Sequence, residues 1–194
     1  MVVPVLDLRK SALVVWDMQE AIASRAYNRA EIVPRIRELL DGYRSRRLPI
    51  VYSQHTTLPD EWANPAMVRS MERRGVPAGS FRLTPGASEW RILSELAPGP
   101  DELVLSKTAA SFFVGTPLDS LLRFRGVQSV VLTGVSTDGG ILSTARHATN
   151  LGFHPVVVED GVGAMTSERQ APALAELREF CDIETAASIL SRLG

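Results

Sequence analysis

The sequence is poor in several residues whose scarcity narrows its function. It contains one cysteine, Cys181, which rules out a disulfide within the chain and fits the reducing conditions of the cytoplasm. Its three histidines are scattered, whereas a metal site needs a cluster of ligands. No apolar run approaches the roughly 20 residues that span a bilayer. We therefore expect a cytoplasmic protein without a metal site or a membrane segment.

The chain also lacks a charge excess and is nearly devoid of lysine. Its 21 basic and 22 acidic residues give a formal net charge of -1, so neither nucleic acid nor a membrane surface is expected as a partner. Only two basic residues, Lys10 and Lys107, are lysine, and the others are arginine. A lysine at the end of an apolar run, as Lys107 is, stands out against this background.

Apolar runs alternate with helical patterns along the chain. The runs are nearly continuous in valine, leucine and isoleucine, which is typical of strands buried on both faces of a parallel sheet. They cover 11–17, 48–54, 101–107, 127–134 and 153–160, and helical patterns cover 30–47, 116–126, 137–152 and 166–180. This alternation predicts a single α/β domain over residues 1–194, in which helices flank a doubly wound, mainly parallel sheet in a Rossmann-like three-layer sandwich.

Residues 56–86 break this alternation. The segment is rich in arginine and proline, and we expect a long loop with one helical turn. Long loops in compact domains are often lids over a site. Arg69, Arg73 and Arg74 could clamp a carboxylate from this loop. The alternative is that they form a solvated helix face.

The ends of the expected strands carry the candidate functional residues, because ligands bind at the carboxyl ends of strands in doubly wound sheets. Asp17 would be partly desolvated there, which raises its pKa and suits it to proton transfer; the alternative is a cap or turn residue. Lys107 could hold a carboxylate ionised or bind an anionic substrate, unless it is an ordinary snorkelling lysine. The turn at 134–140 could bind an oxyanion through backbone N–H groups, or only allow close packing.

A fourth strand end carries Gln54 and His55. His55 could donate a hydrogen bond to a substrate carbonyl or carboxylate group. The alternative is a polar loop residue at the edge of a pocket.

Taken together, these pieces resemble the isochorismatase-like, or cysteine hydrolase, superfamily. The matching stretches are "ALVVWDMQ", "PIVYSQH", "LSKTAASFFVGTPLDSLLRFRGVQSVVLTGVSTDGGILSTARHA" and "PVVVEDGVGAMT", within residues 12–189. The resemblance implies a cofactor-free hydrolase for a small molecule that forms a homodimer or larger homo-oligomer. It also implies a cis peptide at Val135–Ser136. The substrate-binding residues that it implies are Gln54, His55, Phe112, Val135, Ser136, Thr137 and Gly139.

The catalytic residues implied by the resemblance are Asp17, Lys107 and Gly140. In the amidase branch the triad is Asp, Lys and Cys, and the cysteine would stand at Gly140 in "TDGGI". Glycine cannot form a thioester, and Cys181 lies on or beyond the last expected helix. The isochorismatases proper also carry glycine here and hydrolyse a vinyl ether without a covalent intermediate. By this resemblance Asp17 would protonate the substrate, with Lys107 orienting its carboxyl group.

Three hypotheses about function follow. The first is acid-catalysed cleavage of an isochorismate-like vinyl ether in secondary metabolism, releasing pyruvate, with activity falling as pH rises through the pKa of Asp17. The second is an amidase or ureidase relative in which Gly140 replaces the cysteine, naturally or by design. Restoring Gly140→Cys is then expected to create activity on small amides and ureides. The third is a non-catalytic binding homologue.

Overall fold

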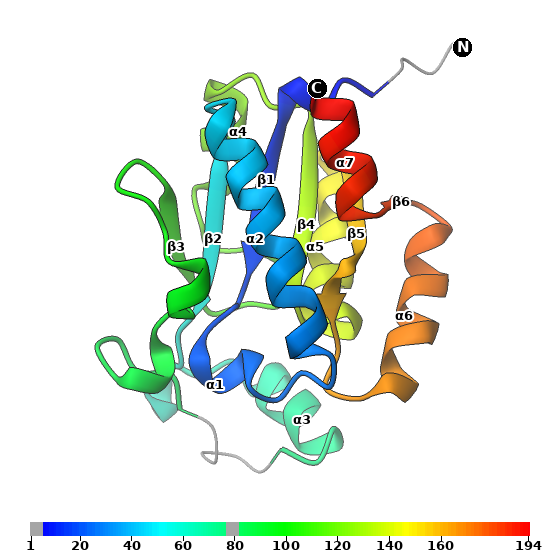
Figure 1. The fold of residues 1–194 in the computed structure, drawn as a ribbon. Coiled ribbons are helices and arrows are strands. Elements are labelled where there is room, and N and C mark those ends of the chain that lie inside the picture. The colour runs from blue at the N-terminus through cyan, green and yellow to red at the C-terminus, as the bar shows by residue number, and fades with distance from the viewer. Residues whose placement is uncertain (1–5, 77–81) are drawn as a thin grey trace.

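The structure, a computed structural model, describes residues 6–76 and 82–194. Its centre is a six-stranded, all-parallel sheet with the strand order β3-β2-β1-β4-β5-β6, which confirms the predicted fold class (Figure 1). The strands are β1 (Ser11–Trp16), β2 (Ile50–His55), β3 (Leu103–Lys107), β4 (Ser129–Val135), β5 (His154–Gly163) and β6 (Asp182–Glu184).

Helices cover both faces of this sheet (Figure 1). They are α1 (Glu20–Ala23), α2 (Arg29–Ser45), α3 (Pro65–Arg73), α4 (Leu118–Phe124), α5 (Leu142–Asn150), α6 (Ser167–Arg178) and α7 (Ala186–Leu193). One apolar core lies between the sheet and α2 with α7, and a second lies between the sheet and α4 with α5 and α6. Within the described ranges, no helix is both long and apolar enough to cross a membrane.

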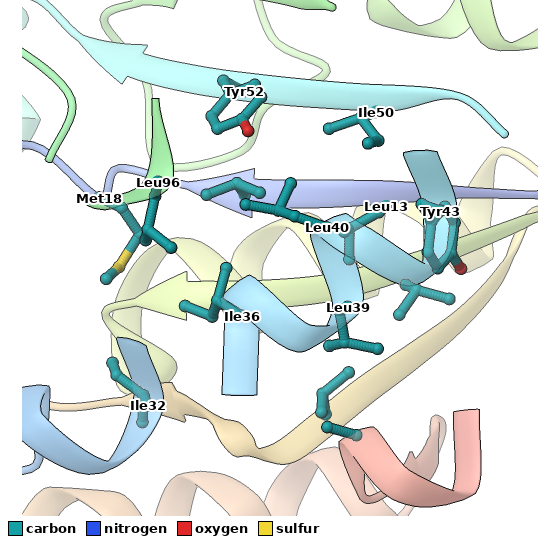
Figure 2. Packing of buried hydrophobic residues seen from close by; sticks show 14 of the residues in the cluster. Leu13, Met18, Ile32, Ile36, Leu39, Leu40, Tyr43, Ile50, Tyr52 and Leu96 are labelled. Atoms are coloured by element: carbon teal, nitrogen blue, oxygen red, sulfur yellow. The ribbon is translucent and has the colours of Figure 1, made fainter. Parts of the chain in front are cut away.

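The helical periodicity of α2 explains how the first core forms. Ile32, Ile36, Leu39, Leu40 and Tyr43 recur at helical spacing, and all five side chains are buried. They belong to one apolar cluster with Leu13 of β1 and with Ile50 and Tyr52 of β2, and in Figure 2 the side chains of Leu40 and Tyr43 lie close to Leu13. The strands they cover are buried along nearly their whole length, as the continuous apolar runs predicted.

The segment 56–86 differs from its prediction as a loop with one helical turn. It contains α3, a helix of nine residues, along with a short 3-10 helix at Asp60–Trp62. The side chain of Asn64 caps α3 by accepting from the N–H of Ala66 at 3.0 Å, and Pro65 begins the helix. The pair Asn64–Pro65 in the sequence is therefore a typical helix start from which α3 could have been predicted. Residues 77–81 of this segment lie outside the described residues.

The carboxyl-terminal strand β6 and helix α7 were not predicted. Strand β6 has three residues, too few to give a clear pattern. Helix α7 had the stronger signal, because Ala186, Ile189 and Leu193 are spaced for one helix face and are buried. Thr185 caps it by accepting from the N–H of Ser188 at 3.2 Å.

The strand order places a crevice between β1 and β4. The chain passes from β1 to β2 and β3 on one side and then returns to β4 on the other side of β1, and ligands bind at such switch points. Asp17 follows β1, and the turn 136–141 follows β4. Helices α1 and α3 lie at this same end of the sheet (Figure 1).

Candidate active site

A cavity of about 710 Å³ opens at this end of the sheet. Its walls come from the ends of β1 to β4, from α3 and from the start of α6. This volume suits a small molecule. The residues predicted as functional that line it are Asp17, His55, Lys107, Val135, Ser136, Gly139 and Gly140.

Asp17 and Lys107 form a buried ion pair at the base of the cavity. The Lys107 ammonium donates to Asp17 Oδ2 at 2.7 Å, and the two side chains are 3% and 8% exposed. The hydroxyl of Ser53 donates to Asp17 Oδ1 at 2.6 Å and accepts from the Asp17 N–H at 3.0 Å. Both oxygens of Asp17 thus accept hydrogen bonds, which is the arrangement of a carboxylate.

The backbone at the strand ends brings these groups together. Asp17 has φ of 44°, a left-handed conformation that aspartate tolerates better than most residues, and the chain turns there as it leaves β1. Ser53 lies on the adjacent strand, where it pairs with Trp16 in the parallel register. Lys107 ends β3 beyond β2, and its long side chain reaches across β2 to Asp17.

The indole of Trp16 supports the ion pair. It is 1% exposed, and the Lys107 ammonium lies 4.2 Å from its ring centroid, close enough for a cation–π interaction. Phe112 packs against it edge-on, with ring centroids 5.6 Å apart and an interplanar angle of 85°. A cation held between an anionic carboxylate and an aromatic face has little freedom to move.

The turn after β4 carries the cis peptide expected between Val135 and Ser136. It continues into a short π-helical segment at Thr137–Ile141 and then into α5. The N–H groups of Gly139 and Ile141 donate to the carbonyl of Ser136 at 3.3 and 3.1 Å. These two N–H groups already donate hydrogen bonds within the turn, so fewer backbone N–H groups remain that could bind an oxyanion.

Gln19 fixes the position of His55. Its side chain accepts from the His55 N–H at 2.7 Å and donates to the His55 carbonyl at 3.1 Å and to the Trp90 carbonyl at 2.8 Å. Burial and, to a lesser extent, the neighbouring Lys107 cation lower the pKa of His55 to about 4, although the Asp17 carboxylate opposes this shift. The imidazole is therefore neutral at physiological pH and can exchange hydrogen bonds with a neutral or anionic ligand.

Three of the residues predicted to bind substrate do not line the cavity. Gln54 donates to the Trp90 carbonyl at 2.9 Å, Phe112 packs behind Trp16, and Thr137 donates to the side chain of Gln170 at 2.8 Å. Cys181 also lies outside the lining, and burial raises the pKa of its thiol to about 12. Within residues 6–76 and 82–194, no cluster of three histidine, cysteine or acidic side chains could hold a metal.

Positive charge gathers along the wall formed by α1, α3 and α6. Arg25, Arg74 and Arg169 line the cavity, whereas Arg69 and Arg73 of the predicted clamp do not. Arg169 lies 3.5 Å from a carboxylate oxygen of Asp138, a long contact for an ion pair. The other oxygen of Asp138 is buried without a hydrogen-bond partner among the described residues.

Sequence reasoning missed several contributors to the site, among them Trp16, Gln19, Ser53 and Arg169. Trp16 and Gln19 lie on either side of Asp17 in "VVWDMQ". The neighbouring sequence does not indicate that Trp16 contacts Lys107 or that Gln19 binds the backbone of His55. Ser53 could have been found from the register of adjacent parallel strands. Arg169 follows a helix start, where a charge is ordinarily solvent-exposed.

Comparisons with known proteins place the sequence and the fold among known relatives. A family model described as the Isochorismatase domain matches residues 11–188. Ureidoacrylate amidohydrolase RutB of Cronobacter turicensis is 30% identical over 91% of this chain and 82% of its own. An isochorismatase family protein from Burkholderia thailandensis is 30% identical, with a TM-score of 0.83 and 99% of each chain covered. A cysteine hydrolase from Pseudomonas syringae, at 23% identity, has the same fold, with a TM-score of 0.86 over 97% of this chain and 94% of its own.

Proposed function

Because the chain belongs to the isochorismatase family of hydrolases, we propose that it hydrolyses a C–N bond in a small amide or ureide that bears a carboxylate. Water is the nucleophile and Asp17 is the general base. The observation that carries this proposal is the pairing of Asp17 with Lys107 and Ser53, which holds the carboxylate in its proton-accepting form at the base of the cavity.

The proposed reaction needs no attacking side chain. Water transfers a proton to the Asp17 carboxylate while its oxygen bonds to the carbonyl carbon of the substrate. The C–N bond then breaks, and the departing nitrogen takes the proton from Asp17. The products are an acid and an amine, or carbamate and an amine for a ureide, and the carbamate then breaks down to ammonia and carbon dioxide. The Lys107 ammonium, 2.7 Å from Asp17, orients the carboxylate and offsets negative charge that develops nearby.

The arginines on the wall support an anionic substrate. Guanidinium groups bind carboxylates through paired, charge-assisted hydrogen bonds. Arg74 and Arg169 line the cavity, as do Asp17 and Lys107, so one small molecule can contact both groups of residues. The neutral His55 adds a hydrogen-bonding group to the cavity lining without adding charge.

Cleavage of a vinyl ether is the second candidate. Glycine at position 140 favours it, because the resemblance places glycine there in the isochorismatases proper. It requires Asp17 as a proton donor, whereas both carboxylate oxygens accept hydrogen bonds from Ser53 and Lys107. The relatives named ureidoacrylate amidohydrolase also favour C–N hydrolysis for this chain.

Two measurements distinguish these functions. The first measures ammonia release from ureidoacrylate and other carboxylate-bearing ureides. The second measures pyruvate release from isochorismate. The Asp17→Asn variant is the negative control in both. We expect Asp17-dependent ammonia release whose rate rises with pH across the acidic range, because a general base acts as its carboxylate. Pyruvate release with a rate that falls as pH rises would instead support the vinyl ether. Binding of these ligands without turnover at any pH would favour a non-catalytic homologue.

A further inference from the structure

Two glycines of β4 and its turn lie against Trp16. A Cβ atom on Gly134 would overlap the backbone of Trp16, its partner in the parallel register, and Gly134 has φ of 108°. A Cβ atom on Gly140 would overlap the indole itself, at Cε2, Cζ2 and Nε1. The ring of Trp16 therefore fills the space that any side chain at position 140 would need.

The indole cannot easily give up this space. Trp16 is 1% exposed and belongs to the apolar core of α4 and α5. Phe112 blocks one direction of movement, and the Lys107 ammonium occupies the ring face. Rotation of the ring would also remove the cation–π contact that helps to keep Lys107 beside Asp17.

The neighbouring Gly139 provides a contrast within the same turn. A Cβ atom there would lie 2.7 Å from the hydroxyl of Ser136 and 3.4 Å from Nη1 of Arg74, and no atom of Trp16 would lie within 4 Å of it. Both of those neighbours are side chains that line the open cavity. The overlap with the indole is thus particular to position 140.

We propose that Trp16 and Gly140 form a size-matched pair that determines the nucleophile of this pocket. The indole takes the volume beside Asp17 and Lys107 that a side chain at position 140 would occupy, so this position supplies no attacking atom. A thiol enters only when both residues are exchanged together. The pairing depends on packing alone, while its consequence for the nucleophile depends on the proposed function. Restoring Gly140→Cys by itself is consequently not expected to create an amidase.

A thermal unfolding cycle tests the pairing. Gly140→Ala and Trp16→Val are each expected to lower Tm by about 5–10 °C. Gly140→Ala would overpack the space that the indole fills, and Trp16→Val would leave a cavity there. The double variant should recover at least half of the summed loss. Gly139→Ala is the matched control, and Trp16→Val should not rescue it. Additive losses at position 140, equal rescue of Gly139→Ala, or a double variant that fails to fold would each overturn the pairing.

Thiol labelling tests the consequence for the site. In a Cys181→Ser background, alkylation by iodoacetamide is compared between Gly140→Cys and Trp16→Val/Gly140→Cys. We expect the double variant to be labelled at least tenfold faster, because only there can the thiol occupy the cavity. Equal labelling rates would overturn the proposal. Neither measurement uses a substrate, so both remain interpretable if the proposed reaction proves wrong.

Discussion

The floor and the wall of the cavity are built in different ways. The floor consists of Asp17, Ser53, Lys107 and Trp16, which project from three strands or their ends and are all buried. The wall consists of α1, α3 and α6 with their arginines, and the side chain of Arg169 is 39% exposed. Buried charges must be paired, whereas exposed ones interact weakly with their neighbours. Substitutions in the floor should therefore affect stability and reaction together, and substitutions in the wall should affect binding alone.

Lys107→Met should produce the largest effect. Methionine keeps an unbranched apolar side chain at this position but leaves the Asp17 carboxylate without its cation. We expect a loss of about 3–5 kcal/mol in the free energy of unfolding, measured by denaturant titration, because the charge left behind is buried and uncompensated. Activity should fall with it. Lys10→Met, which changes the only other lysine at an exposed position, should stay within about 0.5 kcal/mol of wild type.

A second substitution isolates the cause. Adding Asp17→Asn to Lys107→Met removes the unpaired charge, so stability should return in part while activity remains absent. If Lys107→Met were as stable as Lys10→Met, the ion pair would not hold the floor together. If the double variant were less stable than Lys107→Met alone, the loss would come from packing and not from charge.

The same contrast explains what the sequence could predict. The floor follows from runs of apolar residues that end in a polar one, so Asp17 and Lys107 could be placed at one sheet edge before the structure was known. The direct contact between Asp17 and Lys107 could not be predicted from the sequence, because it depends on the Lys107 side chain reaching across β2. The wall depends on how α3 is placed at the carboxyl end of the sheet, and no local sequence pattern encodes that placement. Sequence reasoning consequently selected Arg69 and Arg73 beside Arg74, and missed Arg169.

His55 lies between floor and wall, and it should make stability depend on pH. Its pKa is lowered to about 4 in the folded chain, so the unfolded chain takes up this proton first as pH falls. Stability from the neutral imidazole is complete above about pH 6.5 and is lost as pH falls towards 4, by about 2–3 kcal/mol. Denaturant titrations at pH 7 and pH 4 should show a smaller difference for His55→Gln than for wild type.

The exposed His154 supplies the control for this measurement. The stability of His154→Gln should depend on pH as that of wild type does. Both proteins keep His55, and their carboxylates contribute equally to the change in stability with pH. Equal slopes for His55→Gln and His154→Gln would show that His55 is not held neutral by burial.

Arg74→Ala should have the smallest effect, and it isolates the wall. Arg74 directly follows α3 and reaches the turn at Gly139, so its loss removes one charged contact to a substrate carboxylate. We expect KM for an anionic substrate to rise about tenfold, while Tm and kcat stay unchanged. A tenfold rise corresponds to about 1.4 kcal/mol, which is the order expected for one charge-assisted hydrogen bond. Arg73→Ala, one residue earlier and outside the cavity lining, should leave KM unaltered. A fall in kcat with unchanged KM would instead place Arg74 with the floor, because it would then act on the reacting atoms and not on a remote carboxylate.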